Sequence, residues 1–281
     1  MLNLQDGYVD INGLKIHYYR TGGDLPQVVL NHGALDDGLC WPRVVNALRA
    51  AYDLILPDAR GHGMSDTGAG DYSTEARAAD LIGLIETLGL EKPVIGGHSM
   101  GGDTSLYAAA LRPDLIAGFF MEDPPFTLAG EPLFGGPAGQ GNQLGLKQLR
   151  NALKLIKKAP KFISQPLGRR LMPGGTPEVI EAWLASKQRV SEDFIQILED
   201  PQWLAGGFDD DLGGKVTVPG LLIYGDRDKG AIVSEDAADR IAAQIQGLRV
   251  VHLPGATHDI RRTRFDDYLA AVREFLQDVL R

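Results

Sequence analysis

A serine flanked by glycines is the part of the sequence with the clearest chemical meaning. Ser99 stands in the segment Gly97-His98-Ser99-Met100-Gly101, between an apolar run that ends at Ile95 and an apolar segment with helical spacing. A serine on a tight strand-to-helix turn has a strained backbone, so its neighbours must be small. Its hydroxyl is exposed at the start of the helix, which favours developing negative charge. The spacing therefore predicts that Ser99 is a nucleophile.

A base must accept the serine proton, because a hydroxyl is a weak nucleophile until that proton is removed, and histidine has the suitable pKa. Six histidines are present. His258 follows the last strand-like run, on a loop that should return to the sheet edge where Ser99 lies, so it is the predicted base. Four others are expected to have structural roles: His17 and His252 within strands, His62 in a glycine-rich turn, and His98 pointing away from the nucleophile.

The rest of the sequence predicts a wound α/β sheet that positions these side chains. Residues 8–18 alternate around Asn12-Gly13, which predicts an antiparallel hairpin. Short apolar runs then alternate with helical patterns, which is typical of a mostly parallel sheet buried on both faces by helices. The runs lie at 28–30, 54–56, 94–95, 115–121, 221–224 and 250–253, and the helical patterns at 41–50, 74–88, 100–111, 234–246 and 265–280.

One long stretch interrupts this alternation. From about residue 126 to residue 214 no strand-like run appears, and glycine, proline and helical segments dominate. The sequence therefore predicts a core formed by residues 1–125 and 215–281, with a helical cap inserted at 126–214.

These features resemble the α/β-hydrolase superfamily, in its capped branch with a serine nucleophile, over the whole chain. His32-Gly33-Ala34, after the third strand, resembles the oxyanion loop of the family. The resemblance implies that the backbone N–H groups of Ala34 and Met100 hold the oxyanion. Residues 58–65 match the family's Asp-x-Arg-Gly-His-Gly-x-Ser turn, which is more often structural than catalytic in relatives.

The acid that orients His258 has several candidates. In most relatives it ends a Gly-x-x-Asp motif after the strand that follows the cap, and here that residue is Asp228, our first choice. The loop after it is longer than usual, so Asp226 is an alternative at the same site. Some relatives instead place the acid after the sixth strand, where the alternatives are Glu122 and Asp123.

The composition limits the classes of partner and cofactor to expect. The formal net charge of −9 repels phosphate backbones and anionic lipid surfaces, so neither nucleic acid nor a membrane is expected. Cys40 is the single cysteine, and the chain starts without the features of a secretory signal, so we expect a cytoplasmic protein. The histidine spacing fits no metal site, and neither a metal nor another cofactor is expected. The sequence leaves open whether the protein is a homodimer.

The expected reaction is hydrolysis of a small-molecule carboxylic ester or lactone through an acyl-enzyme. Ser99 argues against haloalkane dehalogenase and epoxide hydrolase activity, because relatives with those activities use an aspartate as nucleophile. Three alternatives stay open: a C–C bond hydrolase, a cofactor-free perhydrolase and a non-catalytic small-molecule receptor of the same fold.

Overall fold

An antiparallel hairpin begins the sheet. The computed structural model describes residues 3–128, 131, 133, 142–171, 177–198 and 210–281. Strands β1 (Gln5–Ile11) and β2 (Leu14–Arg20) pair on either side of Asn12 and Gly13, whose φ angles are 51° and 82°. Two successive residues with positive φ are the geometry that an Asn-Gly hairpin favours, and the predicted hairpin is confirmed.

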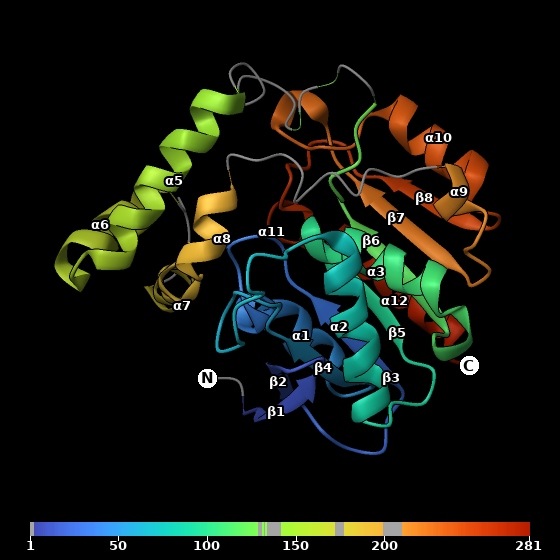
Figure 1. Cartoon of the computed structure of the whole chain (residues 1–281). Coiled ribbons are helices and arrows are strands. Elements are labelled where there is room, and N and C mark those ends of the chain that lie inside the picture. The colour runs from blue at the N-terminus through green and yellow to red at the C-terminus, as the bar shows by residue number, and fades with distance from the viewer. Residues whose placement is uncertain (1–2, 129–130, 132, 134–141, 172–176, 199–209) are drawn as a thin grey trace.

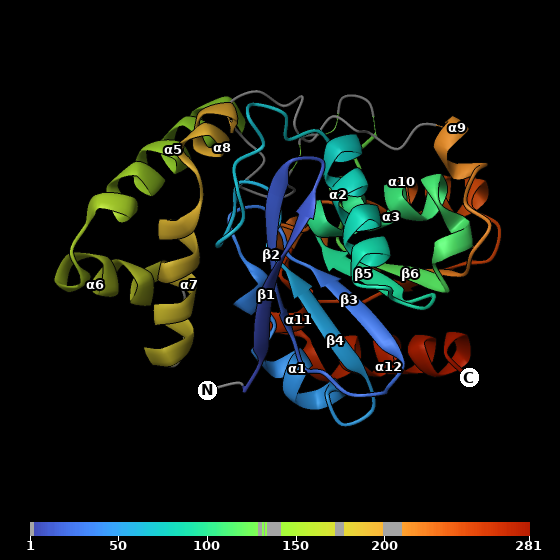
Figure 2. The ribbon, with the colours of Figure 1, turned by 60° about the horizontal axis from the view of Figure 1, so that its bottom comes forward.

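Six further strands complete an eight-stranded sheet with the order β1-β2-β4-β3-β5-β6-β7-β8 (Figures 1 and 2). They are β3 (Gln27–Asn31), β4 (Asp53–Pro57), β5 (Val94–His98), β6 (Gly118–Glu122), β7 (Gly220–Tyr224) and β8 (Leu248–His252). β2 is antiparallel to β4, and the neighbouring pairs from β4 to β8 are parallel. The predicted α/β fold class is confirmed.

The central strands are buried on both faces. Every residue of β4, β5, β6 and β7 is buried, which explains why their sequences lack polar alternation. β8 departs from the expectation of a fully buried strand, because all five of its residues are exposed or partly exposed. It lies at the end of the sheet and pairs with β7 on one side, so solvent reaches it from the other.

Helices cover both faces of the sheet. Apolar residues of α2 (Thr74–Thr87), α3 (Met100–Leu111) and α10 (Glu235–Gln244) share one core cluster on one face. Those of α1 (Pro42–Leu48), α11 (Ile260–Thr263) and α12 (Phe265–Val279) share a second cluster on the other face. The sheet is thus fixed between two layers, and its parallel strands end at the edge where the predicted site residues lie.

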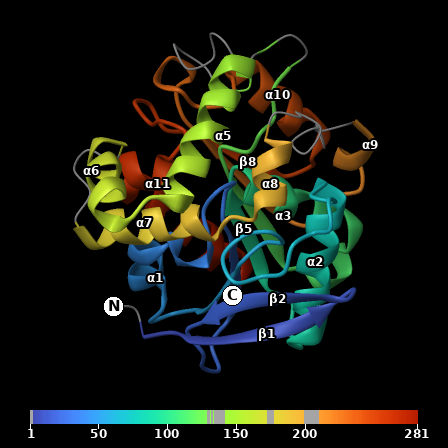
Figure 3. The same ribbon diagram turned by 60° about the vertical axis from the view of Figure 1, so that its left-hand side comes forward.

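Four helices stand apart from these layers (Figures 1 and 3): α5 (Asn142–Lys158), α6 (Lys161–Leu171), α7 (Pro177–Arg189) and α8 (Glu192–Ile197). The short helix α9 (Asp210–Gly213), also within the predicted cap range of 126–214, lies instead against α3 and α10, and its Leu212 joins the core. Parts of that range fall outside the described residues, and the cap boundaries stay a prediction. None of the helices in the described part of the chain has the length and apolar character that a bilayer crossing needs.

Candidate active site

The turn between β5 and α3 carries Ser99, as the sequence predicts. Ser99 has φ 50° and ψ −119°, a conformation that is strained for a residue with a side chain. A Cβ atom at Gly97 would lie 2.5 Å from the backbone oxygen of Asn31, and one at Gly101 would lie 2.2 Å from the same oxygen. Glycine is therefore required on both sides of Ser99, because the backbone at the end of β3 passes directly against the turn.

The two residues expected to supply the oxyanion donors lie beside this turn. β3 and β5 are neighbours, with Asn31 opposite Gly97, so the loop after β3 begins next to Ser99. Ala34 in that loop packs against the apolar cluster that contains Met100. Met100 is the first residue of α3, where backbone N–H groups have no acceptor within the helix. The structure brings the two residues together, and their role as donors stays a prediction.

Asp123 contacts the predicted base. Nδ1 of His258 lies 2.6 Å from Oδ2 of Asp123, which is fully buried directly after β6. The backbone N–H groups of Ile232 and Val233 donate to the two carboxylate oxygens at 2.8 and 3.1 Å. The carboxylate is thus fixed as an acceptor, which assigns the imidazole proton to Nδ1. In the neutral ring, Nε2 is then the nitrogen that can accept a serine proton.

Asp228, our first choice for the acid, lies at the surface rather than beside His258. Asp228 lies in the short helix η4 (Arg227–Lys229), and its side chain is 72% exposed and 3.2 Å from the ammonium of Lys229. The helical turn at Arg227–Lys229 carries Asp228 to the surface. The chain then returns inward, and the N–H groups of Ile232 and Val233 bind Asp123 instead.

The other two carboxylates also bind elsewhere. Asp226 accepts from Nε2 of His252 at 2.7 Å and from the backbone of Gly255 at 2.7 Å. Glu122 is fully buried and accepts from the backbone N–H of Arg261 at 2.8 Å and from its guanidinium at 3.2 Å. Glu122 ends β6 and Asp123 follows it, and successive residues of a strand face opposite sides. Glu122, the main alternative acid, therefore fixes Arg261 rather than the base.

Sequence reasoning missed a contact of His98. Its Nε2 donates to the backbone oxygen of His258 at 3.0 Å, and the two rings lie 4.5 Å apart. Burial, together with the positive charge of Arg261, lowers the pKa of His98 well below its usual value, so this imidazole is neutral. His98 fixes the main chain of the base, and its place beside Ser99 in the motif was the signal that could have suggested such a role.

The pKa of His258 is raised above its ordinary value of 6.5. Burial by itself lowers the pKa, but the hydrogen bond and the negative charge of Asp123 raise it by more. The imidazolium is therefore stabilised, which is what a base needs once it has taken the serine proton.

We expect kcat/KM for an ester to rise with pH through a midpoint above 6.5, because the protonated imidazole cannot act as a base and the pKa of His258 is raised. A pH series from 5 to 9 on the wild type and on Asp228→Asn should give the same midpoint for both, since Asp228 lies away from the imidazole. A flat profile across this range would contradict a histidine base.

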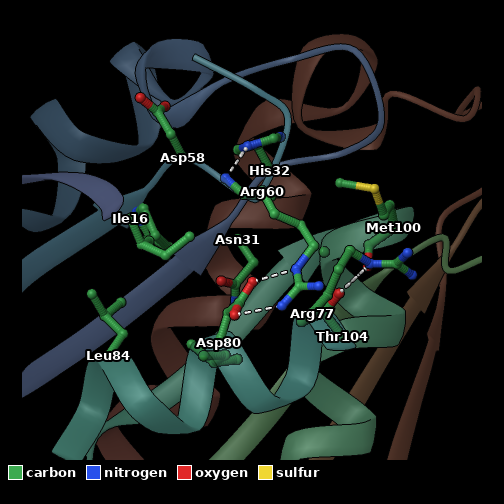
Figure 4. Close-up of a pocket in the computed structure, with 14 residues that line it drawn as sticks. Ile16, Asn31, His32, Asp58, Arg60, Arg77, Asp80, Leu84, Met100 and Thr104 are labelled. Atoms are coloured by element: carbon green, nitrogen blue, oxygen red, sulfur yellow. Dashed lines mark hydrogen bonds and ion pairs between the residues drawn. The ribbon is translucent and has the colours of Figure 1, made fainter. Parts of the chain in front are cut away.

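A small cavity lies against the start of α3 (Figure 4). Its volume is about 30 Å³, enough for one water molecule, and its wall includes Met100 and Thr104 of α3. Arg60 and Asp80 form two hydrogen bonds there, of 2.6 and 2.7 Å. The described residues of its wall do not include Ser99, so the cavity belongs to the support of the turn rather than to a substrate pocket.

A family model for the alpha/beta hydrolase fold matches residues 26–260, a range that contains the nucleophile turn and the Asp123–His258 pair. The chain belongs to the α/β-hydrolase family. This confirms the resemblance drawn from its motifs.

Relatives of this α/β hydrolase include enzymes named for N-acyl substrates. It is 34% identical to the N-formylmaleamate deformylase of Pseudomonas putida over 122 residues, which cover 43% of this chain and 46% of the deformylase. It is 27% identical to the 2-(acetamidomethylene)succinate hydrolase of Mesorhizobium japonicum over 273 residues, 95% of this chain and 94% of that protein. A crystal structure of an N-formylmaleamic acid deformylase from Pseudomonas putida has a TM-score of 0.78 at 21% identity, covering 95% of this chain and all of the other, and shows the shared fold.

Two of the helices outside the sheet layers, α5 and α8, pack directly on the turn that carries Ser99. Phe194 of α8 is fully buried in the apolar cluster that holds Met100, and Leu153 of α5 belongs to the same cluster. Ala34 borders it from the core side. Among the described residues, no group of three or more His, Cys, Asp or Glu side chains could hold a metal ion. The surroundings of Ser99 thus include an apolar wall formed by side chains of α5, α8 and the loop after β3.

Proposed function

We propose that this α/β hydrolase cleaves a small-molecule carboxylic ester or lactone with a triad of Ser99, His258 and Asp123. The observation that carries the proposal is the 2.6 Å contact between Asp123 and Nδ1 of His258, which leaves Nε2 to act as the base. The strained turn at Ser99 supports it, because such a turn presents a hydroxyl where strand and helix meet.

The steps follow from these positions. The hydroxyl oxygen of Ser99 attacks the carbonyl carbon while Nε2 of His258 takes the hydroxyl proton, and Asp123 stabilises the imidazolium. The N–H groups of Ala34 and Met100 donate to the carbonyl oxygen as it becomes an anion, and each such donor typically contributes about 3 kcal/mol. The bond to the leaving oxygen breaks, and His258 gives the proton to the departing alcohol.

Water then completes the cycle. His258 removes a proton from the water molecule, which attacks the acyl carbon, and the same proton returns to the oxygen of Ser99 as the acid leaves.

A second candidate is hydrolysis of an N-acyl group on a small acid. The names of the deformylase and the acetamidomethylene succinate hydrolase favour it. The same triad would catalyse this reaction, with an amine as the leaving group. A screen of short esters, lactones and N-acyl amino compounds, ranked by kcat/KM, decides between the two candidates.

Trapping the acyl-enzyme tests the common chemistry. On mixing with p-nitrophenyl acetate, we expect a burst of one nitrophenol per protein. After an acid quench, one acetyl group should be found on the peptide that contains Ser99. Both results are expected because the acyl-enzyme of such an activated ester forms faster than it hydrolyses. Turnover with an unmodified Ser99 peptide, or no turnover of any compound in the screen, would overturn the proposal.

A further inference from the structure

The residue after the oxyanion donor Ala34 is held at both of its backbone polar groups. The N–H of Leu35 donates to Nε2 of His62 at 3.2 Å, and the C=O of Leu35 accepts from Nζ of Lys187 at 2.9 Å. Leu35 has φ 69°, a conformation that residues with bulky side chains adopt only when their surroundings enforce it. The geometry of the loop that carries Ala34 therefore depends on these two contacts.

His62 is fixed as the acceptor in this arrangement. Its Nδ1 donates to the backbone oxygen of Arg60 at 3.0 Å, so Nε2 carries no proton. Burial, and then the neighbouring His32, lowers the pKa of His62 to about 3, so the ring stays neutral. The ring also lies 4.3 Å from that of Phe194 in α8, and the N–H of Ser191 donates to the backbone oxygen of Gly61 at 2.7 Å. The cap is thus docked on the turn that holds Leu35 from the core side.

Lys187 brings the cap itself to Leu35. It lies near the end of α7, it is 5% exposed, and its ammonium is 2.5 Å from Oδ1 of Asp36 as well as bonded to Leu35. Burial raises the pKa of Asp36, but the charges of Lys187, Arg262 and Arg261 outweigh it and hold the carboxyl ionised. The ammonium is therefore anchored by a charge at the position where it meets the backbone of Leu35.

A neighbouring contact on the same helix offers a comparison. Arg189, also in α7, pairs through its guanidinium with the carboxylate of Asp37, the residue that follows Asp36, rather than with the backbone of Leu35. Beside both contacts, a cavity of about 110 Å³ lies between α7 and α1 and is lined by Trp41 and Trp183. Polar contacts beside this cavity therefore join α7 to the core.

We propose that Lys187 is a positioning residue that couples the docking of the cap to the geometry of the oxyanion hole. It fixes the C=O of Leu35 in the turn that the N–H of Asp36 closes on the C=O of Gly33 at 3.1 Å, and through this turn it fixes the N–H of Ala34. The hole is therefore complete only while α7 is in place. The inference rests on the proposed function, in which Ala34 is an oxyanion donor. It assigns Lys187 no contact with the reacting atoms.

Lys187→Met tests this role, because it keeps an unbranched side chain while removing the ammonium. Arg261 and Arg262 remain 3.5 Å from Asp36, so the buried carboxylate keeps cationic partners. We expect kcat for p-nitrophenyl acetate to fall about 10- to 100-fold with KM changed less than about threefold, as expected for a misplaced transition-state donor. The Ki of a short alkylboronic acid, whose adduct with serine places an oxygen in the hole, should rise in parallel.

Arg189→Met is the matched control. It removes a cation of α7 from the adjacent aspartate without releasing Leu35, so kcat and the boronate Ki should stay within about threefold of the wild type. Melting curves of both variants confirm folding. An unchanged kcat in Lys187→Met, or an equal loss in both variants, would overturn the assignment.

Hydrogen exchange separates this inference from the proposed function. Deuterium uptake by a peptide covering residues 33–38 should be faster in Lys187→Met than in Arg189→Met and the wild type, whether or not the protein turns over an ester. If the wild type forms no acyl-enzyme at Ser99, the proposed function fails. The exchange data still report whether the contact of Lys187 with Leu35 holds the loop. Unchanged exchange in Lys187→Met shows that the contact does not hold the loop.

Discussion

Asp123→Asn is expected to lower kcat by about 10,000-fold in a protein that still folds. An asparagine can turn its amide NH₂ toward His258, and the imidazole then carries its proton on Nε2 and cannot accept another from Ser99. Even with its oxygen toward the ring, the neutral amide no longer stabilises the imidazolium. The loss should appear mainly in kcat, because the interaction is stronger in the transition state than in the ground state.

The same substitution also costs stability. Each carboxylate oxygen of Asp123 accepts from one N–H group, that of Ile232 or that of Val233. Asparagine has a single side-chain oxygen, so it can accept from only one of the two. One buried N–H without an acceptor costs about 1 to 3 kcal/mol, so melting temperature must be measured together with turnover. Activity should be reported per folded protein.

Asp228→Asn is the control for this prediction. Its side chain is 72% exposed and paired with Lys229, so we expect kcat within about twofold and stability within about 0.5 kcal/mol of the wild type. Glu122→Gln should lower stability, because it weakens a buried pair with Arg261, while the folded fraction stays active. An active Asp123→Asn beside an inactive Asp228→Asn would contradict Asp123 as the acid and would assign that role to Asp228.

The local features of the site could be predicted from the sequence. The spacing of glycines around Ser99 follows from a turn in which a Cβ would meet the backbone of Asn31, and this requirement acts on adjacent residues. The hairpin around Asn12 and Gly13 is equally local, because positive φ at both positions selects the residue types. Such constraints leave a pattern at neighbouring positions, which can be recognised without knowing that the segment in the way is the one that ends at Asn31.

The choice of acid depends on contacts between distant segments. β6 and β7 are neighbouring parallel strands, so carboxylates after either strand arrive at the same edge of the sheet. What decides between them is the path of the chain after Asp228, where the N–H groups of Ile232 and Val233 return to bind Asp123, more than 100 residues earlier. The sequence contains no periodicity that records this contact.

The contact of Lys187 with Leu35 is hidden for a related reason. A lysine near the end of a helix is usually solvated and interacts with the last carbonyl groups of its own helix. Its burial here results from the docking of α7 on the loop after β3, across 152 residues of sequence. Charge and helical spacing alone describe an ordinary basic residue at this position.

Ser99→Ala is expected to lower kcat by about a millionfold, the size of effect seen when the nucleophile of a serine hydrolase is removed. Labelling by a fluorophosphonate should disappear with it, because the reagent needs the activated oxygen. The fold should persist, since the backbone N–H of Ser99 still donates to the oxygen of Glu122 at 2.8 Å and alanine tolerates the turn no worse than serine. Residual turnover would report what the oxyanion donors and binding contribute without a nucleophile.

Ser105→Ala is the matched control for Ser99→Ala. Ser105 is a buried serine in α3, the helix that follows Ser99, and its hydroxyl donates to the backbone oxygen of Gly101 at 2.7 Å and accepts from the amide of Asn31 at 3.0 Å. Its loss should cost about 1 kcal/mol of stability but leave one fluorophosphonate label per folded protein, found on the peptide of Ser99. Intact-mass and peptide measurements on both variants show which serine carries the label. A label or near-normal turnover that survives Ser99→Ala would show that Ser99 is not the nucleophile. Another serine would then have to lie within hydrogen-bond reach of a base, since activation of a hydroxyl requires one.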